Sequence, residues 1–175
     1  MRLLILLFCV FVTSAAWAIT TEQNADGTPR TLTDLIGQYI DTPEGALNWK
    51  TLGHTGEVIV KTTRNVEGDV QDLEYVKPEF PPTVQQLDGQ QITIKGYMFP
   101  LEESDDQKIF LLGPFPMSCP FHYHVGPSMV IEVHADQHPV KFSYDPVTIT
   151  GTLELIPDDW ENGLFYRLKD THQVD

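Results

Sequence analysis

QITIKGYMFPL, residues 91–101, is the stretch of sequence that decides the fold. Apolar and polar side chains alternate along it, which predicts a β-strand with one buried face. Gly96 interrupts the stretch, and a glycine inside a strand indicates a bulge or the tight bend of a small barrel. The stretch therefore favours a strand that belongs to a small barrel.

Four further segments show strand patterns: KIFLLG (108–113), MVIEVHA (129–135), VTITGTLEL (147–155) and LFYRLKD (164–170). The third of these has a central glycine, Gly151, which again indicates a bulge or bend. No long helical pattern separates the five segments. The sequence therefore predicts a mainly β fold, a small five-stranded antiparallel barrel of the OB type over 84–175. A small β-sandwich is the alternative architecture.

Residues 19–83 are predicted to form a partly helical extension and a connector. Apolar residues at three-and-four spacing predict a short helix over 32–40, and Thr42-Pro43 predicts a second helix that Gly53 ends. Residues 56–63 alternate like a strand, and 65–72 are rich in turn-forming residues. Residues 77–89 contain three prolines and no periodicity, so we expect a connector on the protein surface.

Residues 1–18 have the pattern of a secretory signal peptide. Arg2 precedes an apolar block over 3–12, and an Ala-x-Ala sequence ends at Ala18, where we expect cleavage. A membrane-spanning helix needs about 20 apolar residues, so this block is too short to be one. We therefore expect a periplasmic protein that does not span the membrane after cleavage.

The net charge of the chain limits its partners. There are 25 acidic and 11 basic residues, which gives a formal net charge of −14 with neutral histidines. A surface this acidic repels nucleic acid and anionic lipid, and it attracts cations or basic partners. Nucleic acid is therefore not an expected partner.

The segment FPMSCPFHYHVGP, residues 115–127, combines a cysteine with two histidines. Signal cleavage removes Cys9, so Cys119 is the only remaining cysteine and cannot form an intramolecular disulfide. His122 and His124 project to one side of an extended segment, and a turn at Pro120 brings the thiolate towards them. A thiolate with two imidazoles suits Zn²⁺ or copper and not Mg²⁺ or Ca²⁺. Cys119, His122 and His124 are therefore the predicted metal ligands.

Three protein ligands leave a fourth position open. Candidates for it in the neighbouring sequence are Met117, Met129, Glu132, His134 and His138. Glu132 and His134 have equal parity in one expected strand, so they are expected to face the same side. A blue-copper site would combine Cys119 and His122 with Met129 and His54. Such a loop normally precedes the last strand of the fold, whereas here more than one predicted strand follows it.

Two other functions remain open from these residues. In one, the protein is a metal-free interaction module of an envelope complex, the 115–127 loop is its docking surface and Cys119 is buried. In the other, His122 or His124 lowers the pKa of Cys119 in a thiol-dependent enzyme. The sequence offers no recognisable third catalytic residue or oxyanion hole, so an enzyme is not the favoured prediction.

Several of these segments resemble a family of secreted bacterial proteins catalogued as a domain of unknown function. The family shares the strand pattern L-x-G-x-x-[VI]-x-[IV]-x-G-Y-M-x-P-L, which Leu87 to Leu101 match, and a later cysteine, which Cys119 matches. The resemblance covers roughly 47–170. It implies an accessory role in the periplasm, in transition-metal uptake or with an ABC transporter, and no known catalytic activity.

Overall fold

The computed structural model describes residues 31–66, 69–118 and 125–174. Its helices are α1 (Leu32–Tyr39), α2 (Trp49–Leu52), α3 (Pro82–Gln85) and the 3-10 helix η2 (Pro127–Met129). Its strands are β1 (Gly56–Val66), β2 (Asp69–Glu79), β3 (Gln91–Pro100), β4 (Asp106–Gln107), β5 (Ile109–Gly113), β6 (Ile131–His134), β7 (Val140–Lys141), β8 (Val147–Leu155) and β9 (Tyr166–Val174). No helix within these ranges is long and apolar enough to cross a membrane.

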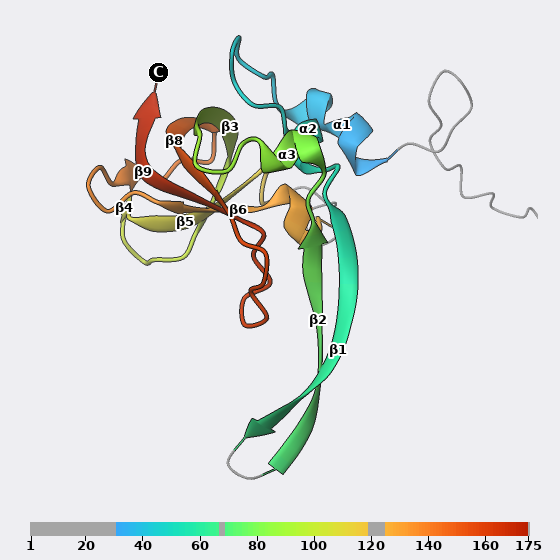
Figure 1. Ribbon diagram of the computed structural model, residues 1–175. Helices are drawn as coiled ribbons and strands as arrows, with labels where there is room; N and C mark the ends of the chain where they lie inside the picture. Colours follow the sequence, from blue (N-terminus) through green and yellow to red (C-terminus); the bar gives the residue numbers. More distant parts are fainter. Residues whose placement is uncertain (1–30, 67–68, 119–124, 175) are drawn as a thin grey trace, which may run out of the picture. The chain divides into compact units, whose positions relative to one another are not determined.

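Five strands form a closed barrel in the order β3-β5-β6-β9-β8, and β8 returns to β3. Taken along the chain this is the order 1-2-3-5-4, so the predicted mainly β, OB-like barrel is confirmed and the sandwich alternative is wrong (Figure 1). The prediction of a fully antiparallel barrel is also wrong, because β6 and β9 pair in parallel. A closed ring of five strands cannot alternate in direction throughout, and since the other four pairs are antiparallel, β6 and β9 must run in the same direction.

β3 changes its pairing partner at Gly96. Residues 91–96 pair with β8, and residues 97–100 pair with β5. A Cβ atom at Gly96 would lie 2.7 Å from Leu112 Cγ and 3.0 Å from the Gly113 carbonyl oxygen, so only glycine fits at this crossing. The bend predicted from this glycine is therefore explained by the close approach of β5.

Gly151 lies at an irregularity in the pairing of β8 with β9. The register shifts between Thr150 and Thr152, and a Cβ atom at Gly151 would lie 2.7 Å from the Lys169 carbonyl oxygen. Two residues of β9, Asp170 and Thr171, lie opposite Gly151, so the irregularity predicted at this glycine is a bulge whose extra residue belongs to β9.

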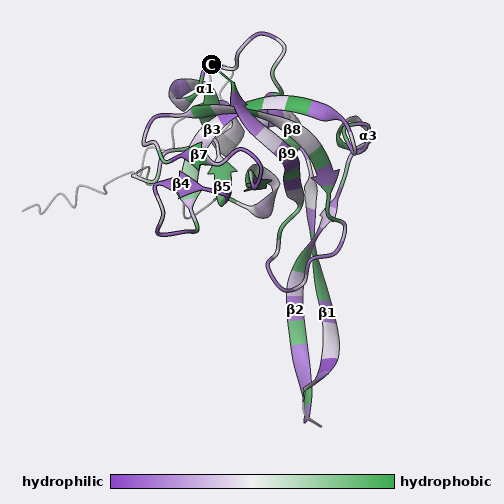
Figure 2. Ribbon diagram, turned by 90° about the vertical axis from the view of Figure 1, so that its left-hand side faces the viewer, coloured by the Kyte–Doolittle hydropathy of each residue, from purple (hydrophilic) through white to green (hydrophobic). Residues whose placement is uncertain are grey.

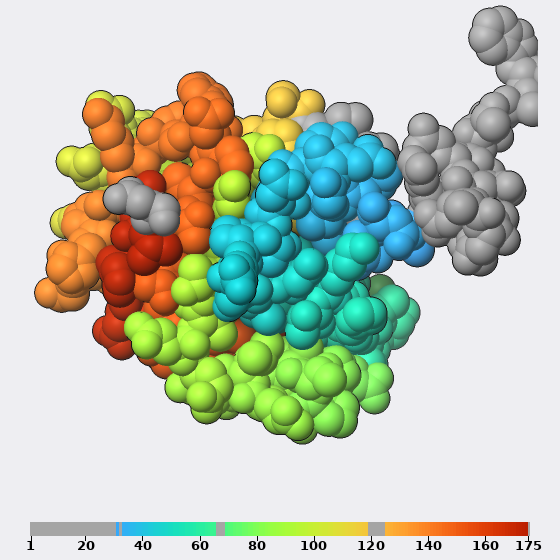
Figure 3. Space-filling model, turned by 90° about the horizontal axis from the view of Figure 1, so that it is seen from above, coloured from blue at the N-terminus to red at the C-terminus, as the bar shows by residue number. Residues whose placement is uncertain are grey.

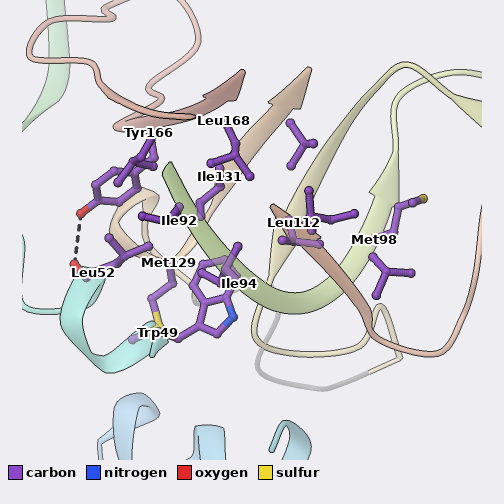
Figure 4. Packing of buried hydrophobic residues seen from close by; sticks show 14 of the residues in the cluster. Trp49, Leu52, Ile92, Ile94, Met98, Leu112, Met129, Ile131, Tyr166 and Leu168 are labelled. Atoms are coloured by element: carbon purple, nitrogen blue, oxygen red, sulfur yellow. Dashed lines mark hydrogen bonds between the residues drawn. The ribbon is translucent and has the colours of Figure 1, made fainter. Parts of the chain in front are cut away.

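Helix α2 closes one end of the barrel core. Trp49 and Leu52 are buried, and the Trp49 indole donates a hydrogen bond of 2.7 Å from Nε1 to the Lys95 carbonyl oxygen. The Tyr166 hydroxyl donates to the Leu52 carbonyl oxygen at 3.1 Å (Figure 4). Burial raises the pKa of Tyr166 to about 12, so this hydroxyl stays a donor at neutral pH.

The N-terminal helices differ in part from their prediction. The helix predicted over 32–40 is confirmed as α1, and Thr31 and Asp34 form a capping box at its start. The helix predicted from Thr42 begins only at Trp49, after the cap Asn48. Gly45 has a φ of +77°, and this left-handed residue stops a helix from starting earlier. In Figure 3 the blue and cyan residues of this segment cover the centre of one face.

Strands β1 and β2 form a long antiparallel hairpin, with Gly56 opposite Glu79 and Val66 opposite Asp69 (Figure 1). The predicted strand over 56–63 is confirmed, but the connector predicted over 77–89 begins inside β2 and contains α3. Sequence periodicity misses β2 because most of its side chains are exposed on both faces, and polar and apolar residues mix along it (Figure 2).

Two contacts join the hairpin to the loop over 156–165. Lys77 Nζ lies 2.7 Å from Asp158 Oδ2, and the Arg64 guanidinium lies 4.1 Å from the centre of a Trp160 ring. These contacts support one face of a two-stranded sheet that is only marginally stable alone.

We predict that Trp49→Ala lowers the free energy of unfolding by about 3–5 kcal/mol, because it empties the end of the core and removes the donor to the Lys95 carbonyl. Urea denaturation followed by circular dichroism measures this difference. Val70→Ala is the control, since Val70 is 70% exposed on the hairpin and its loss is expected to change stability by less than about 0.5 kcal/mol. Equal effects of the two substitutions would contradict the packing described for α2.

Candidate functional site

The predicted metal ligands Cys119, His122 and His124 lie outside the residues that the structure describes. The geometry of the site is therefore built from the chain on both sides of 119–124. The two flanks come from β5, which leads into the segment, and from η2, which leads out of it to β6.

The flank before the segment is anchored in the core. Phe115 follows β5, and its side chain is only 1% exposed. Its ring meets the Tyr39 ring edge to face, with 5.2 Å between the ring centres. The Tyr97 hydroxyl donates to the Tyr39 carbonyl oxygen at 2.9 Å, which holds the end of α1 beside β3. The chain therefore leaves the barrel from a fixed position.

The flank after the segment is anchored as well. The Met129 amide donates to the Gly126 carbonyl oxygen at 2.9 Å within η2. Ser128 is buried and its hydroxyl donates to Glu57 Oε1 at 3.4 Å, which ties η2 to the base of the hairpin. The Glu57 carboxylate also lies against Gly126. Two fixed ends therefore bound the segment that carries the predicted ligands.

Met129 is a core residue. Its side chain is 6% exposed, and its terminal carbon lies 2.6 Å from the position that a Cβ atom would take on Gly53. Figure 4 shows Met129 beside Trp49 among the buried side chains. A thioether in this position packs the end of the barrel core. Met117, in contrast, is 45% exposed and lies two residues before Cys119.

Glu132 and His134 face the same side of β6, as their parity predicts. His134 Nε2 lies 2.7 Å from Glu132 Oε1, and Arg167 Nε donates to the same oxygen at 2.7 Å. Arg167 Nη1 also reaches Glu154 Oε2 at 3.3 Å, and Glu154 Oε1 accepts from Lys169 Nζ at 2.7 Å. These residues form a ladder of polar contacts and ion pairs across β6, β9 and β8, so Glu132 already has a cationic partner in Arg167.

Sequence reasoning misses Arg167 as the partner of Glu132. The two residues are opposite each other in the parallel pairing of β6 and β9, and they lie far apart in the chain. No pattern within a short stretch of sequence predicts that pairing.

The last candidate ligand, His138, is exposed, and its ring centre lies 6.3 Å from that of His172. Among the residues that the structure describes, no three His, Cys, Asp or Glu side chains are grouped closely enough to hold a metal ion.

An apolar cavity of about 220 Å³ lies beside the two flanks, and sequence reasoning does not predict it. The described residues that line it are Phe99, Leu111, Gly113, Pro114, Phe115, Val125 and Val130. Phe99 and Leu111 are cross-strand partners on the outer face of β3 and β5, since their neighbours Met98 and Leu112 point into the barrel core. The cavity therefore lies outside the barrel, where the chain leaves β5.

These features define a class of protein: a small OB-like barrel with a long hairpin and an anchored loop between its second and third strands. The chain belongs to the family described as proteins of unknown function, DUF3299, whose model matches residues 34–171. The family membership expected from Leu87 to Leu101 is therefore confirmed. A crystal structure of a DUF3299 family protein from Pseudomonas aeruginosa PAO1 is 25% identical, with a TM-score of 0.41, covering 54% of this chain and 67% of that one. No curated protein matches the chain.

We predict that Glu132→Gln destabilises the protein by about 1–2 kcal/mol at neutral pH, because it removes the closer of the two carboxylates that pair with the partly buried Arg167. Burial raises the pKa of Glu132, whereas the hydrogen bonds from Arg167 and His134 lower it, and the net pKa lies below the ordinary value of 4.5. A lowered pKa stabilises the fold above the ordinary value and loses this effect as the pH falls through the folded-state pKa. The gap between wild type and variant should therefore narrow as the pH falls below the ordinary value and through the lowered folded-state pKa.

Urea denaturation at a series of pH values measures this gap. The matched control is Glu74→Gln, which removes an exposed ion pair with Lys61 and should cost less than about 1 kcal/mol. A gap for Glu132→Gln that stays constant down to acid pH would show that the carboxylate charge has no role in the ladder.

Proposed function

We propose that the protein binds one Zn²⁺ or copper ion through Cys119, His122 and His124. One thiolate and two imidazoles are the donors that these metals prefer, and hard cations such as Mg²⁺ prefer oxygen ligands. The formal net charge of −14 raises the local concentration of any cation near the surface.

One observation carries this proposal: both ends of the 119–124 segment are anchored. Phe115 on one side and Ser128 on the other are buried against the rest of the fold. Anchored ends reduce the conformational entropy that ligands lose when they converge on an ion. A short loop held in this way needs less binding energy to order than a free linker of the same sequence.

Met117 supplies the fourth donor in this proposal. Its side chain is 45% exposed, and it lies next to the predicted ligands in the sequence. Met129 is packed in the core and Glu132 is paired with Arg167. A thioether donor favours Cu(I) over Zn²⁺.

The proposed role is that of a periplasmic accessory protein that delivers the metal or serves a transporter complex. The signal-like sequence over 1–18 supports the location. Because a fold alone does not define a function, the metal content of the protein is what tests this role.

We expect the protein purified from its native cell envelope to contain about one equivalent of zinc or copper by elemental mass spectrometry. Cys119→Ser and His122→Ala each remove a ligand, so both should lose the metal and keep the circular dichroism spectrum of the wild type. His172→Ala is the control, because His172 lies on the far strand β9 outside the proposed ligand set. Protein that contains neither metal, or variants that keep it in full, would refute the proposal.

We expect Met117→Leu to weaken Cu(I) binding by about tenfold or more and to change Zn²⁺ binding much less, because only the softer ion gains from a thioether. Competition with a chromophoric chelator measures both affinities. Met129→Leu is the matched control: the same substitution in a core methionine should leave both affinities unchanged. If Met129→Leu and Met117→Leu had the same effect on Cu(I), Met117 would not be a ligand.

A further inference from the structure

Strand β1 has an open edge. Within the part of the chain that the structure describes, β1 and β2 form a two-stranded sheet of their own. Because β2 occupies one edge of β1, the backbone N–H and C=O groups along the other edge have no strand partner among these residues. An open edge of this kind can pair with a strand of another chain.

The open edge is apolar at its centre. Val58 is 46% exposed and Ile59 is 62% exposed. With Val60 they form a run of three β-branched residues, the type that favours strand pairing. Glu57 lies at one end of this run and Lys61 at the other, and we call residues 57–61 the EVIVK segment.

The EVIVK segment is complementary to a second copy of itself. When two identical strands pair in antiparallel about a two-fold axis, each contact between two residues occurs twice. If Ile59 lies opposite Ile59 of the second copy, Val58 lies opposite Val60 and Glu57 lies opposite Lys61. An ion pair then closes each end of an apolar centre, and no like charges are opposite each other within the segment.

The pairing within the hairpin extends this complementarity. Val76 lies opposite Ile59, and Tyr75 lies opposite Val60. Joining two copies through β1 gives a sheet of four strands, with an apolar row of Val76, Ile59, Ile59 and Val76 across one face. On the other face, Tyr75 and Val60 continue into Val58 of the second copy. A two-stranded sheet is marginally stable alone, so the two added strands supply packing that the hairpin lacks.

The edge of β2 is less suited to pairing with its own copy. Strand β2 has four carboxylates and one amine, which gives a net charge of −3, on Asp69, Asp72, Glu74, Glu79 and Lys77. Strand β1 has one carboxylate and two cationic side chains. Pairing two β2 strands therefore brings together an excess of like charges, and pairing two β1 strands does not.

We propose that the protein forms a two-fold symmetric dimer in which the EVIVK segments of two copies pair in antiparallel. Lys61 then lies between two carboxylates, that of Glu74 in its own chain, 2.6 Å away, and that of Glu57 in the second copy. The Ser128 hydroxyl, 3.4 Å from Glu57 Oε1, positions this carboxylate. The dimer goes beyond the proposed metal site, because none of the predicted metal ligands belongs to β1.

Sedimentation equilibrium of the full protein over a series of concentrations tests for the dimer. We expect the mass to rise from one chain to two and to stop there. A reducing agent and a chelator are present throughout, so neither a disulfide between two Cys119 residues nor a shared metal can join the chains. A mass of one chain up to about 500 µM would overturn the proposal. Larger assemblies would indicate head-to-tail pairing of β1 with β2, and they would overturn it as well.

Ile59→Lys tests the centre of the contact. It places two like charges opposite each other at the two-fold axis and removes the apolar contact, so the dimer should weaken at least about tenfold. The matched control is Val70→Lys, since Val70 is 70% exposed and belongs to β2. It should leave the dimer unchanged. Equal weakening by the two substitutions would contradict pairing through β1.

Exchanged charges test the register and give a gain of binding that a folding defect cannot mimic. Lys61→Glu brings like charges together at both ends of the paired segment, and so does Glu57→Lys, so each variant alone should dimerise several-fold more weakly than the wild type. An equal mixture of the two should form a mixed dimer, because every contact between positions 57 and 61 again joins opposite charges. A mixture that associates no better than its components would overturn this register.

Discussion

The structure depends on the close packing of β3 against β5 at Gly96. At this residue the strand ends its pairing with β8 and begins its pairing with β5, which closes the barrel. A side chain cannot fit there, because Leu112 and the Gly113 carbonyl occupy the space. The same close approach sets the position of β5, so it also determines where the chain enters the 114–118 flank. The closed core, the apolar cavity and the anchored loop therefore share one steric constraint.

The end of the core is built on the same strand. Trp49 donates to the Lys95 carbonyl oxygen, one residue before Gly96, and Tyr166 closes the other side of α2 through the Leu52 carbonyl oxygen. Helix α2 and the barrel thus share one hydrophobic core. The division predicted between an extension over 19–83 and a barrel over 84–175 stays a prediction about domains, although all barrel strands begin after Gln90.

Local patterns predict much of this fold, and non-local pairings account for what they miss. Alternation identifies β3, and glycines within strands indicate the bend at Gly96 and the irregular pairing opposite Gly151. The parallel pairing of β6 with β9 depends on which strands become neighbours, which no window of sequence reports. β2 is missed because its stability comes from pairing with β1 and from contacts such as Lys77 with Asp158. Parity places Glu132 beside His134, but only the register of β9 brings Arg167 to them.

The candidate site divides in the same way. Donor chemistry alone selects Cys119, His122 and His124, and it also selects Met129, which packing then places in the core. The cavity combines residues from β3, β5 and the two loop flanks, so a pattern within any one segment cannot reveal it. The sequence thus predicts which residues could bind a metal, and the fold shows that some of these donors, such as Met129, are packed in the core.

The central claim is that Cys119, His122 and His124 converge on one metal ion. A crystal structure of the metal-loaded protein, with anomalous diffraction recorded at the zinc and copper edges, tests this most directly. We expect one anomalous peak about 2.3 Å from the Cys119 sulfur and about 2.0–2.1 Å from a ring nitrogen of each histidine. A peak at other residues, with these three side chains pointing apart, would contradict the account.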